Sequence, residues 1–280
     1  MTQERFLMVE VDPPQNGDMS TMIKIAEDLR ERDVTSITFT DCPGGVPHAD
    51  SILTAVKVKE ETGMDVVPYV CCRDKNLIAL RSQILGAHAN GIRNMLFITG
   101  DQVPIDKQNT INSVFNCNSV NLMELATDLN RFELVKNPIR FGGGVNYVDV
   151  PLDIEIKRVK AKMDNGALFF FSQPVYTEED ADKVRQIAKL TGANIYCGIR
   201  PLVDKRNADF LKEQVKRINV PDELVMAFSP DMSRAEGEAI GLEHAKKMLA
   251  YINDFTYGYY FNFPYNRTYL LDELIPFLQR

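Results

Sequence analysis

The stretch GIRNMLFITGD, residues 91–101, decides the fold that we expect for this chain. Its apolar run at residues 95–98 is short and continuous, which is typical of a strand buried on both faces. Such strands occur in parallel sheets that helices cover on both sides. The run ends on Thr99-Gly100-Asp101, at the carboxyl end of the predicted strand, where α/β folds place their sites. Two interpretations stay open: either Gly100 admits a flat ligand beside Asp101, or the three residues form only a turn.

The rest of the chain repeats this alternation of strand and helix. Apolar runs predict eight strands, at residues 6–11, 36–40, 65–71, 95–98, 139–145, 167–172, 194–199 and 256–261. Helical patterns lie between these strands, at residues 18–32, 49–62, 76–90, 119–131, 152–165 and 177–190. After the seventh strand, a further helical region reaches residue 252, with breaks near Pro221 and Pro230. A closing helix is predicted after the last strand, at residues 269–279. Eight such units predict an α/β protein, a (β/α)8 TIM barrel forming a single domain over residues 1–280. A doubly wound open sheet is the alternative, although no G-x-G-x-x-G motif follows a predicted strand.

Composition and charge argue against several classes of function. The net charge is −7, and no basic run carries interleaved aromatic residues, which argues against nucleic acid as a partner. No stretch approaches the ~20 apolar residues that span a bilayer, and the first residues lack the pattern of a signal peptide. We therefore expect a cytoplasmic protein that binds no membrane and keeps its five cysteines reduced. With only three histidines in the sequence, we expect no metal site.

In a barrel the carboxyl ends of all strands meet on one face, so the residues there form the predicted site. They are Glu10, Thr40, Tyr69, residues 99–101, residues 142–144, Gln173, Arg200 and residues 261–267. This set is polar and rich in glycine. It lacks the ligand cluster of a metal hydrolase and the lysine of a Schiff-base aldolase.

Several features of this face have both a chemical and a structural interpretation. Glu10 interrupts an apolar strand, where burial favours the protonated form that a general acid needs, unless an inner arginine pairs with it. The glycines at 142–144 either admit a flat ligand or relieve crowding inside the barrel. Gln173 either binds the donor and acceptor edge of a heterocycle or is satisfied by backbone groups. The loop at residues 102–118 is long and polar, which indicates a functional loop or a lid.

Four segments, taken in order, resemble the methylenetetrahydrofolate reductase family: VEVDPP at 9–14, GIRNMLFITGD at 91–101, FFFSQPVY at 169–176 and GIRPL at 198–202. The similarity runs from about Glu10 to the end of the sequence. It is greatest to the reductase half of bacterial proteins that fuse this enzyme to a homocysteine methyltransferase. The resemblance implies a (β/α)8 barrel that binds FAD at the strand ends. It also implies that NADH or NADPH reduces the flavin and leaves, and that 5,10-methylenetetrahydrofolate then accepts the hydride to become 5-methyltetrahydrofolate.

The resemblance also implies roles for single residues. Glu10 matches the general acid that opens the five-membered folate ring, and Asp101 matches the aspartate beside flavin and pterin. Gln173 matches the glutamine that holds the pterin, and Arg267 an arginine of the folate and nucleotide pocket. The flavin contacts implied in this way are Thr40, Tyr69, Ile98, Thr99, Gly100, Asp101, Ser119, Gly143 and Lys162, with Lys162 near the phosphates.

The sequence departs from the family pattern at three positions. Tyr69 stands where many members have a histidine, Thr99 where an arginine is common, and Val145 where an aromatic residue is usual. Two other functions stay open: a pterin-binding barrel without flavin, and a flavin-holding subunit that takes electrons from a partner protein. We expect the chain to form a homo-oligomer or to be a subunit of a larger complex.

Overall fold

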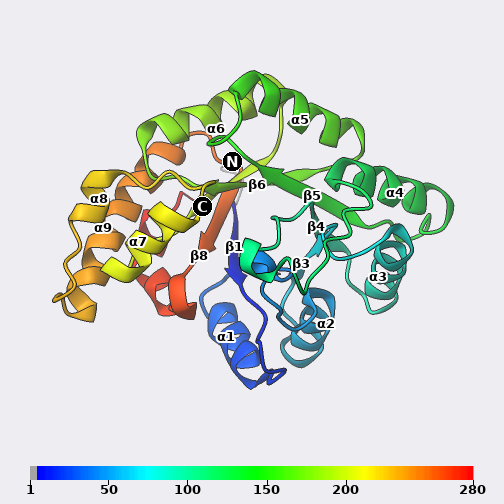
Figure 1. Ribbon diagram of the computed structural model, residues 1–280, viewed down its shortest axis with the longest axis horizontal. Coiled ribbons are helices and arrows are strands. Elements are labelled where there is room, and N and C mark those ends of the chain that lie inside the picture. Colours follow the sequence, from blue (N-terminus) through cyan, green and yellow to red (C-terminus); the bar gives the residue numbers. More distant parts are fainter. Residues whose placement is uncertain (1–4, 280) are drawn as a thin grey trace. The chain divides into compact units, whose positions relative to one another are not determined.

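The computed structural model describes residues 5–279, whose strands close into a barrel in chain order (Figure 1). The pairings β2–β3, β3–β4, β4–β5, β6–β7 and β7–β8 are all parallel. The eight strands of this part of the chain are β1 (Phe6–Val11), β2 (Ser36–Phe39), β3 (Val66–Cys71), β4 (Asn94–Ile98), β5 (Arg140–Val145), β6 (Phe169–Pro174), β7 (Ile195–Ile199) and β8 (Gly258–Asn262). This closed order confirms the predicted (β/α)8 barrel and excludes the doubly wound open sheet.

Helices follow the strands, as the alternation in the sequence predicts. The α-helices of residues 5–279 are α1 (Ser20–Arg30), α2 (Ser51–Thr62), α3 (Leu77–Ala89), α4 (Ser119–Phe132), α5 (Leu152–Asp164), α6 (Glu178–Thr191), α7 (Lys205–Gln214), α8 (Asp222–Met226) and α9 (Arg234–Ile252). Three of these helices begin at a capping side chain, which accepts one or two hydrogen bonds from amides of the first turn. The caps are Asp50 for α2, Asn76 for α3 and Thr177 for α6. Within the same residues, no helix has both the length and the apolar character needed to cross a bilayer.

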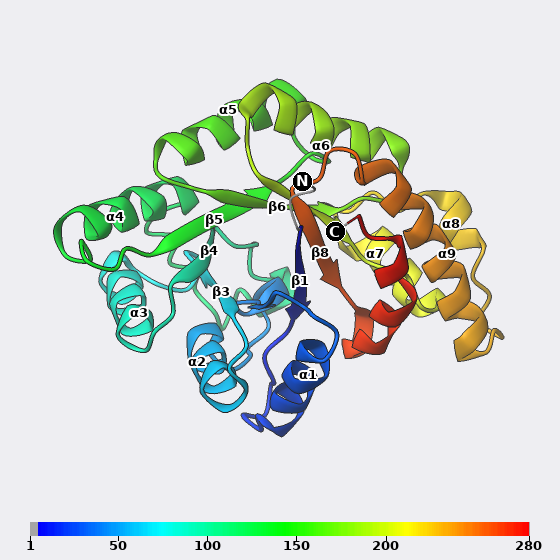
Figure 2. The ribbon, with the colours of Figure 1, turned by 180° about the vertical axis from the view of Figure 1, so that it is seen from behind.

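The described residues form two compact units, which are treated separately below. The first contains residues 10–144 and 160–169. In it, neighbouring helices from α1 to α4 pack against one another, α2 against β2 and β3, and α4 against β4 (Figure 1 and Figure 2). The second contains residues 5–9, 145–159 and 170–279, where α6 packs on α9 and α7 on α8. That the whole chain is one domain stays a prediction.

The strand within GIRNMLFITGD is β4, and it is buried as its sequence predicts. Met95, Leu96 and Phe97 are each at most 2% exposed. Strand β4 pairs with β3 through Tyr69 and Leu96, and with β5 through Leu96 and Gly142. Because these pairings are parallel, the carboxyl ends of β2, β3, β4 and β5 share one edge. Most of the predicted site residues lie along this edge.

Two segments differ from the predicted elements. The predicted helix at 269–279 is instead part of a series of 3-10 turns, η3 (Pro264–Asn266), η4 (Thr268–Glu273) and η5 (Ile275–Phe277). Pro276 explains the difference, because it lacks the N–H that an α-helix would use at this position. Strand β6 covers residues 169–174 instead of the predicted 167–172, and its later end places Gln173 within the strand. The loop at 102–118 is irregular as expected, with only one short 3-10 turn, η2 (Ile105–Lys107), among its described residues.

Candidate functional site

The side chain of Glu10 lies against a tyrosine from a strand that is distant in sequence. Glu10 is partly buried on β1, and the hydroxyl of Tyr69 on β3 donates a hydrogen bond to its Oε2 over 2.7 Å. Burial, and next the negative charge of Glu10, raise the pKa of Tyr69 well above its ordinary value. The hydroxyl therefore keeps its proton and serves as a donor. Such a donor stabilises the ionised carboxylate, whereas burial favours the protonated form, so the two effects on Glu10 oppose each other.

A second polar pair joins the ends of β1 and β2. Thr40 follows β2 directly and is buried, and its hydroxyl donates to Oδ1 of Asp12 over 2.6 Å. Asp12 was not among the predicted site residues. The signal available in the sequence was its position directly after the apolar strand that contains Glu10. The structure thus adds a carboxylate to the predicted edge.

Thr99 joins the end of β4 to the start of α4. Its Oγ1 accepts a hydrogen bond from the amide of Ser119 over 3.1 Å and donates one to Ser119 Oγ over 3.3 Å. The side chain of Asn118 caps the same helix by accepting hydrogen bonds from the amides of Val120 and Asn121. Two predicted flavin contacts, Thr99 and Ser119, are therefore in direct contact. Since the capped amides already have partners, an anion near this helix would be bound chiefly by the helix dipole and by side chains.

Gly100 is required by packing of the chain on itself. Its φ is +95°, and a Cβ there would lie 2.3 Å from the Sγ of Cys71 and 3.0 Å from the Cβ of Arg73. Close approach of a ligand is not needed to explain this glycine, and that role stays a prediction. Beside it, Ile98 is partly buried at the last position of β4 and Asp101 is exposed. The Asp101 side chain is therefore open to solvent at this edge, and its contact with a ligand stays a prediction.

The three glycines of β5 have different surroundings. At Gly142 a Cβ would lie 2.3 Å from a backbone carbonyl oxygen, so crowding explains this residue. At Gly143 it would lie 2.8 Å from Cε of Met123 and 3.3 Å from Cδ of Lys162, and both of these side chains are long and flexible. Gly144 faces open space, and its carbonyl accepts a hydrogen bond from Nζ of Lys162 over 2.6 Å. Of the three glycines, Gly144 is the one that has open space beside it, and the ammonium group of Lys162 lies next to this space.

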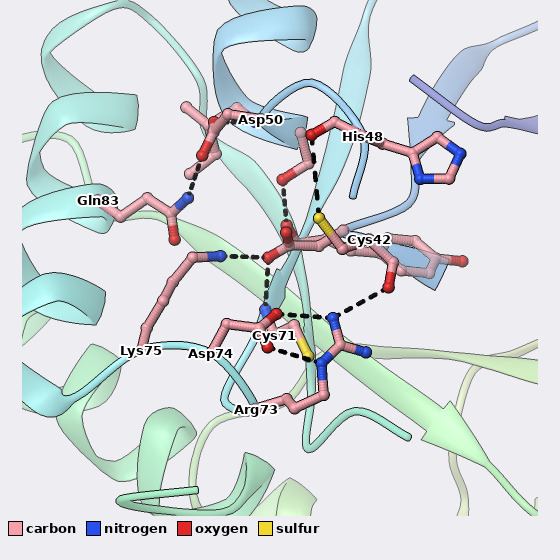
Figure 3. Close-up of polar contacts among 12 residues, drawn as sticks. Cys42, His48, Asp50, Cys71, Arg73, Asp74, Lys75 and Gln83 are labelled. Carbon is pink, nitrogen blue, oxygen red and sulfur yellow. Dashed lines mark hydrogen bonds and ion pairs between the residues drawn. The ribbon is translucent and has the colours of Figure 1, made fainter. Parts of the chain in front are cut away.

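A network of ion pairs holds the loops that follow β2 and β3 (Figure 3). Arg73 is 2% exposed, pairs with Asp74 over 2.6 Å, and also donates to a backbone carbonyl of the loop after β2. Nζ of Lys75 lies 2.5 Å from Oδ2 of Asp41, which also accepts from the Cys71 amide. Sequence reasoning missed this network, although the charged run 73–75, which begins two residues after the end of β3, was visible. Because its charges are mutually paired, we assign it a structural role.

The two predicted substrate residues belong to the other unit. Gln173 is partly buried in β6, and its backbone carbonyl lies 3.4 Å from the donating hydroxyl of Tyr147. Arg267 follows η3, pairs with Glu238 over 2.9 Å, and holds its guanidinium 5.1 Å from the centre of the Tyr265 ring. The φ of Tyr265 is +56°, a left-handed conformation that is rare for residues other than glycine. Backbone strain of this kind clusters at functional sites, which is compatible with the role predicted for Arg267.

The donors along the ends of β2–β5 fit a flavin nucleotide. Thr40, Thr99 and Ser119 supply hydroxyl groups. Lys162 supplies a positive charge, and the space beside Gly144 is open. Hydroxyl donors suit a ribityl chain, and an ammonium suits a phosphate. Among residues 5–279, no three His, Cys, Asp or Glu side chains are placed to hold a metal ion.

Comparisons with known proteins give a family and a fold. The family model described as methylenetetrahydrofolate reductase matches residues 1–256. One solved structure is described as an uncharacterized protein from Clostridium thermocellum that binds two copies of 5-methyl-5,6,7,8-tetrahydrofolic acid. Its TM-score is 0.67 at 14% identity, over 98% of this chain and 94% of that one. The structure of a 2,3-dimethylmalate lyase matches with a TM-score of 0.54 at 12% identity, and the match covers 97% of this chain and 80% of that one. These two structures support the fold alone, and no curated protein sequence gives a significant match.

Proposed function

Because the chain belongs to the methylenetetrahydrofolate reductase family, we propose that it reduces 5,10-methylenetetrahydrofolate to 5-methyltetrahydrofolate with FAD as bound hydride carrier. NADH or NADPH is the electron source in this proposal, and one proton is consumed for each folate reduced. The observation that carries it is the hydrogen-bonded pair of Glu10 and Tyr69, on the edge that also holds the predicted flavin contacts. The folate ligand named for the Clostridium thermocellum structure adds support for a reduced folate as substrate. We place the enzyme in the cytoplasm.

The proposed flavin site uses the residues along the ends of β2–β5. Thr40, Thr99 and Ser119 supply hydroxyl groups, and Lys162 supplies positive charge for the phosphates. When bound, the flavin supplies a carrier that takes a hydride from the nicotinamide and gives it to the methylene carbon of the folate. Asp101 places a negative charge at this edge, and this charge disfavours further negative charge nearby.

Glu10 is the general acid of the proposal. The methylene carbon of the folate bridges two nitrogen atoms, and one carbon–nitrogen bond must break before that carbon accepts a hydride. A proton on the departing nitrogen makes it a better leaving group, and Glu10 donates this proton. Tyr69 holds one carboxyl oxygen over 2.7 Å and so orients the acid. Its O–H also stabilises the carboxylate that remains, an interaction that strengthens as the proton leaves.

The two residues of the second unit are proposed to bind the substrate. Gln173 offers an amide donor and acceptor to the pterin edge. Arg267 binds an anionic group of the folate or the nucleotide, and it shares or exchanges its present partner Glu238 when it does so.

The substitution Glu10→Gln tests this mechanism, because it preserves shape and removes the proton. General acid catalysis contributes about 10²–10⁴-fold, so oxidation of the reduced flavin by methylenetetrahydrofolate should slow by at least about 100-fold. Flavin reduction by the nicotinamide needs no proton from Glu10 and should stay within a few-fold of wild type. Anaerobic stopped-flow absorbance follows each half-reaction separately. Equal slowing of both halves would assign Glu10 to the fold, and no slowing would assign the acid to another residue.

A folate-binding barrel without flavin is the second candidate, favoured by the folate ligand of the Clostridium thermocellum structure. The absorbance spectrum of the purified protein separates the two functions. A yellow protein that releases FAD on denaturation supports the reductase. A colourless protein that binds methyltetrahydrofolate and takes up no added flavin supports the alternative.

A further inference from the structure

Two cysteines that the proposed reaction does not use lie with their sulfur atoms in contact. Cys72 directly follows β3 and is completely buried, whereas Cys117 precedes the capping residue of α4 and is partly exposed. Their Sγ atoms are 3.7 Å apart, and both cysteines are free thiols. A disulfide has an S–S distance of about 2.0 Å, so the two sulfurs need to approach by only about 1.7 Å.

Two hydrogen bonds on the amino side of Cys117 hold it in this place. The amide of Val114 donates to the carbonyl of Arg73 over 2.7 Å, and the amide of Leu77 donates to Oδ1 of Asn116 over 3.1 Å. On the carboxyl side, the start of α4 is bonded to the end of β4, as described above. The last part of the loop is therefore fixed against the residues that follow Cys72, and the two sulfurs meet because of this course of the backbone.

We propose that Cys72 and Cys117 form a reversible dithiol, a modification site that small-molecule disulfides oxidise. In the first step the Cys117 thiolate attacks one sulfur of the small disulfide, forms a mixed disulfide with it and expels one thiolate. In the second step Sγ of Cys72 attacks Sγ of Cys117 and expels the second thiolate, which takes up the proton of Cys72 as it leaves. Two cysteine thiols are oxidised to one disulfide, and one small disulfide is reduced to two thiols.

The different burial of the two sulfurs assigns the order of attack. Cys117 is accessible to a reagent from solvent, whereas Cys72 is not. Burial, and next the neighbouring Cys117, raise the pKa of Cys72 well above its ordinary value, so it reacts slowly with external reagents. Cys71, the adjacent residue, directs its Sγ to the carbonyl of Thr99 at 3.6 Å, and burial raises its pKa to about 11. Cys117 is therefore the entry point, and Cys72 is the residue that resolves the mixed disulfide.

The disulfide would change how the loop at 102–118 is held. It would join the residue after β3 covalently to the residue before the cap of α4. The carboxyl end of the loop could then no longer separate from the strand ends where Thr99 and Ser119 meet. This inference concerns the thiols alone and holds whether or not the chain reduces folate.

Oxidised glutathione, followed by alkylation, digestion and mass spectrometry of the full chain, tests the proposal. The wild type should lose the mass of two hydrogen atoms and yield a peptide pair linked through Cys72 and Cys117, and dithiothreitol should reverse both changes. Cys72→Ser should keep one glutathionyl group on Cys117, whereas Cys117→Ser should leave Cys72 unmodified. Cys42→Ser, a change at another partly exposed cysteine, is the matched control and should form the same link.

Two results would overturn the proposal. One is wild-type protein that carries glutathione on Cys117 without forming the link. The other is a link that fragmentation of the peptides assigns to Cys71 instead of Cys72. Because each variant is read out chemically, on folded protein with a native circular dichroism spectrum, loss of activity plays no part in the decision.

Discussion

Replacing Tyr69 by phenylalanine removes one hydrogen bond and leaves the aromatic ring in place. The lost bond is the 2.7 Å contact from the tyrosine hydroxyl to Oε2 of Glu10. Hydrogen bonds to charged groups contribute about 1.5–3 kcal/mol, and about 1.4 kcal/mol corresponds to one pH unit or a tenfold change in rate. The donor favours the ionised carboxylate, so without it Glu10 holds its proton to higher pH. The folate half-reaction should therefore keep its rate to a pH about 1–2 units higher than in wild type.

The same loss should slow the reaction where Glu10 is protonated in both proteins. The carboxylate that forms as the proton leaves has lost its donor, so the plateau of the folate half-reaction should fall by about tenfold or more. Anaerobic stopped-flow at a series of pH values measures both effects through the flavin absorbance. The nicotinamide half-reaction, followed in the same instrument, should change little.

Tyr259→Phe is the matched control for losing a buried tyrosine hydroxyl. Tyr259 is completely buried near the amino end of β8, and its hydroxyl donates to Asn253 and accepts from the amide of Gln279. This change should lower stability and leave the pH profile of the folate half-reaction where it is. A Tyr69→Phe profile that coincides with wild type would refute the role given to the hydrogen bond. Equal shifts in both variants would show that the effect is general loss of packing.

Three further predictions concern the flavin, the glycines of β5 and the pH dependence of stability. Asp101→Asn should raise the midpoint potential of the flavin and slow folate reduction, and an unchanged potential in a redox titration would remove the electrostatic role. Gly144→Ala should fold normally and purify with less flavin, because its Cβ occupies the open space beside Lys162. Gly142→Ala should instead lower the melting temperature, because its Cβ would lie against backbone. Full flavin content in Gly144→Ala would contradict the first expectation. Burial lowers the pKa of His244 below its ordinary 6.5, so the unfolded chain binds more protons there, and stability to urea should fall as the pH drops from about 7 to about 5. His244→Gln should reduce that fall, and an unaltered fall would assign it to other groups.

The architecture of the chain could be predicted because its signals are local. The apolar run 95–98 and the helical patterns at 49–62, 76–90 and 177–190 depend on residues that are near one another in the sequence. The structure places β4 at this run and begins α2, α3 and α6 within two residues of the predicted starts. The segment after Arg267 shows the limit of periodicity. Its apolar spacing resembles a helix, but one missing N–H at Pro276 favours short 3-10 turns.

The candidate site could be predicted as a set of positions, but its contacts could not. Alternation of strand and helix was enough to place Glu10, Thr40 and residues 98–101 near strand ends, because parallel strands bring those ends to one edge. It did not distinguish the glycines of β5. Gly142 is explained by a backbone carbonyl and Gly144 faces open space, and this difference depends on how neighbouring segments pack.

What the sequence by itself determined is therefore the order of elements, the barrel and the list of residues at its carboxyl edge. What only the tertiary structure decided is which of those side chains touch. Glu10 meets Tyr69, and Cys72 meets Cys117, across 59 and 45 residues of chain. Hydrophobic periodicity depends on the nearest few residues, whereas these contacts depend on strand register and on the course of a long irregular loop. A hydrogen bond or a sulfur contact is sensitive to displacements of less than 1 Å, and only the folded backbone fixes positions to that accuracy.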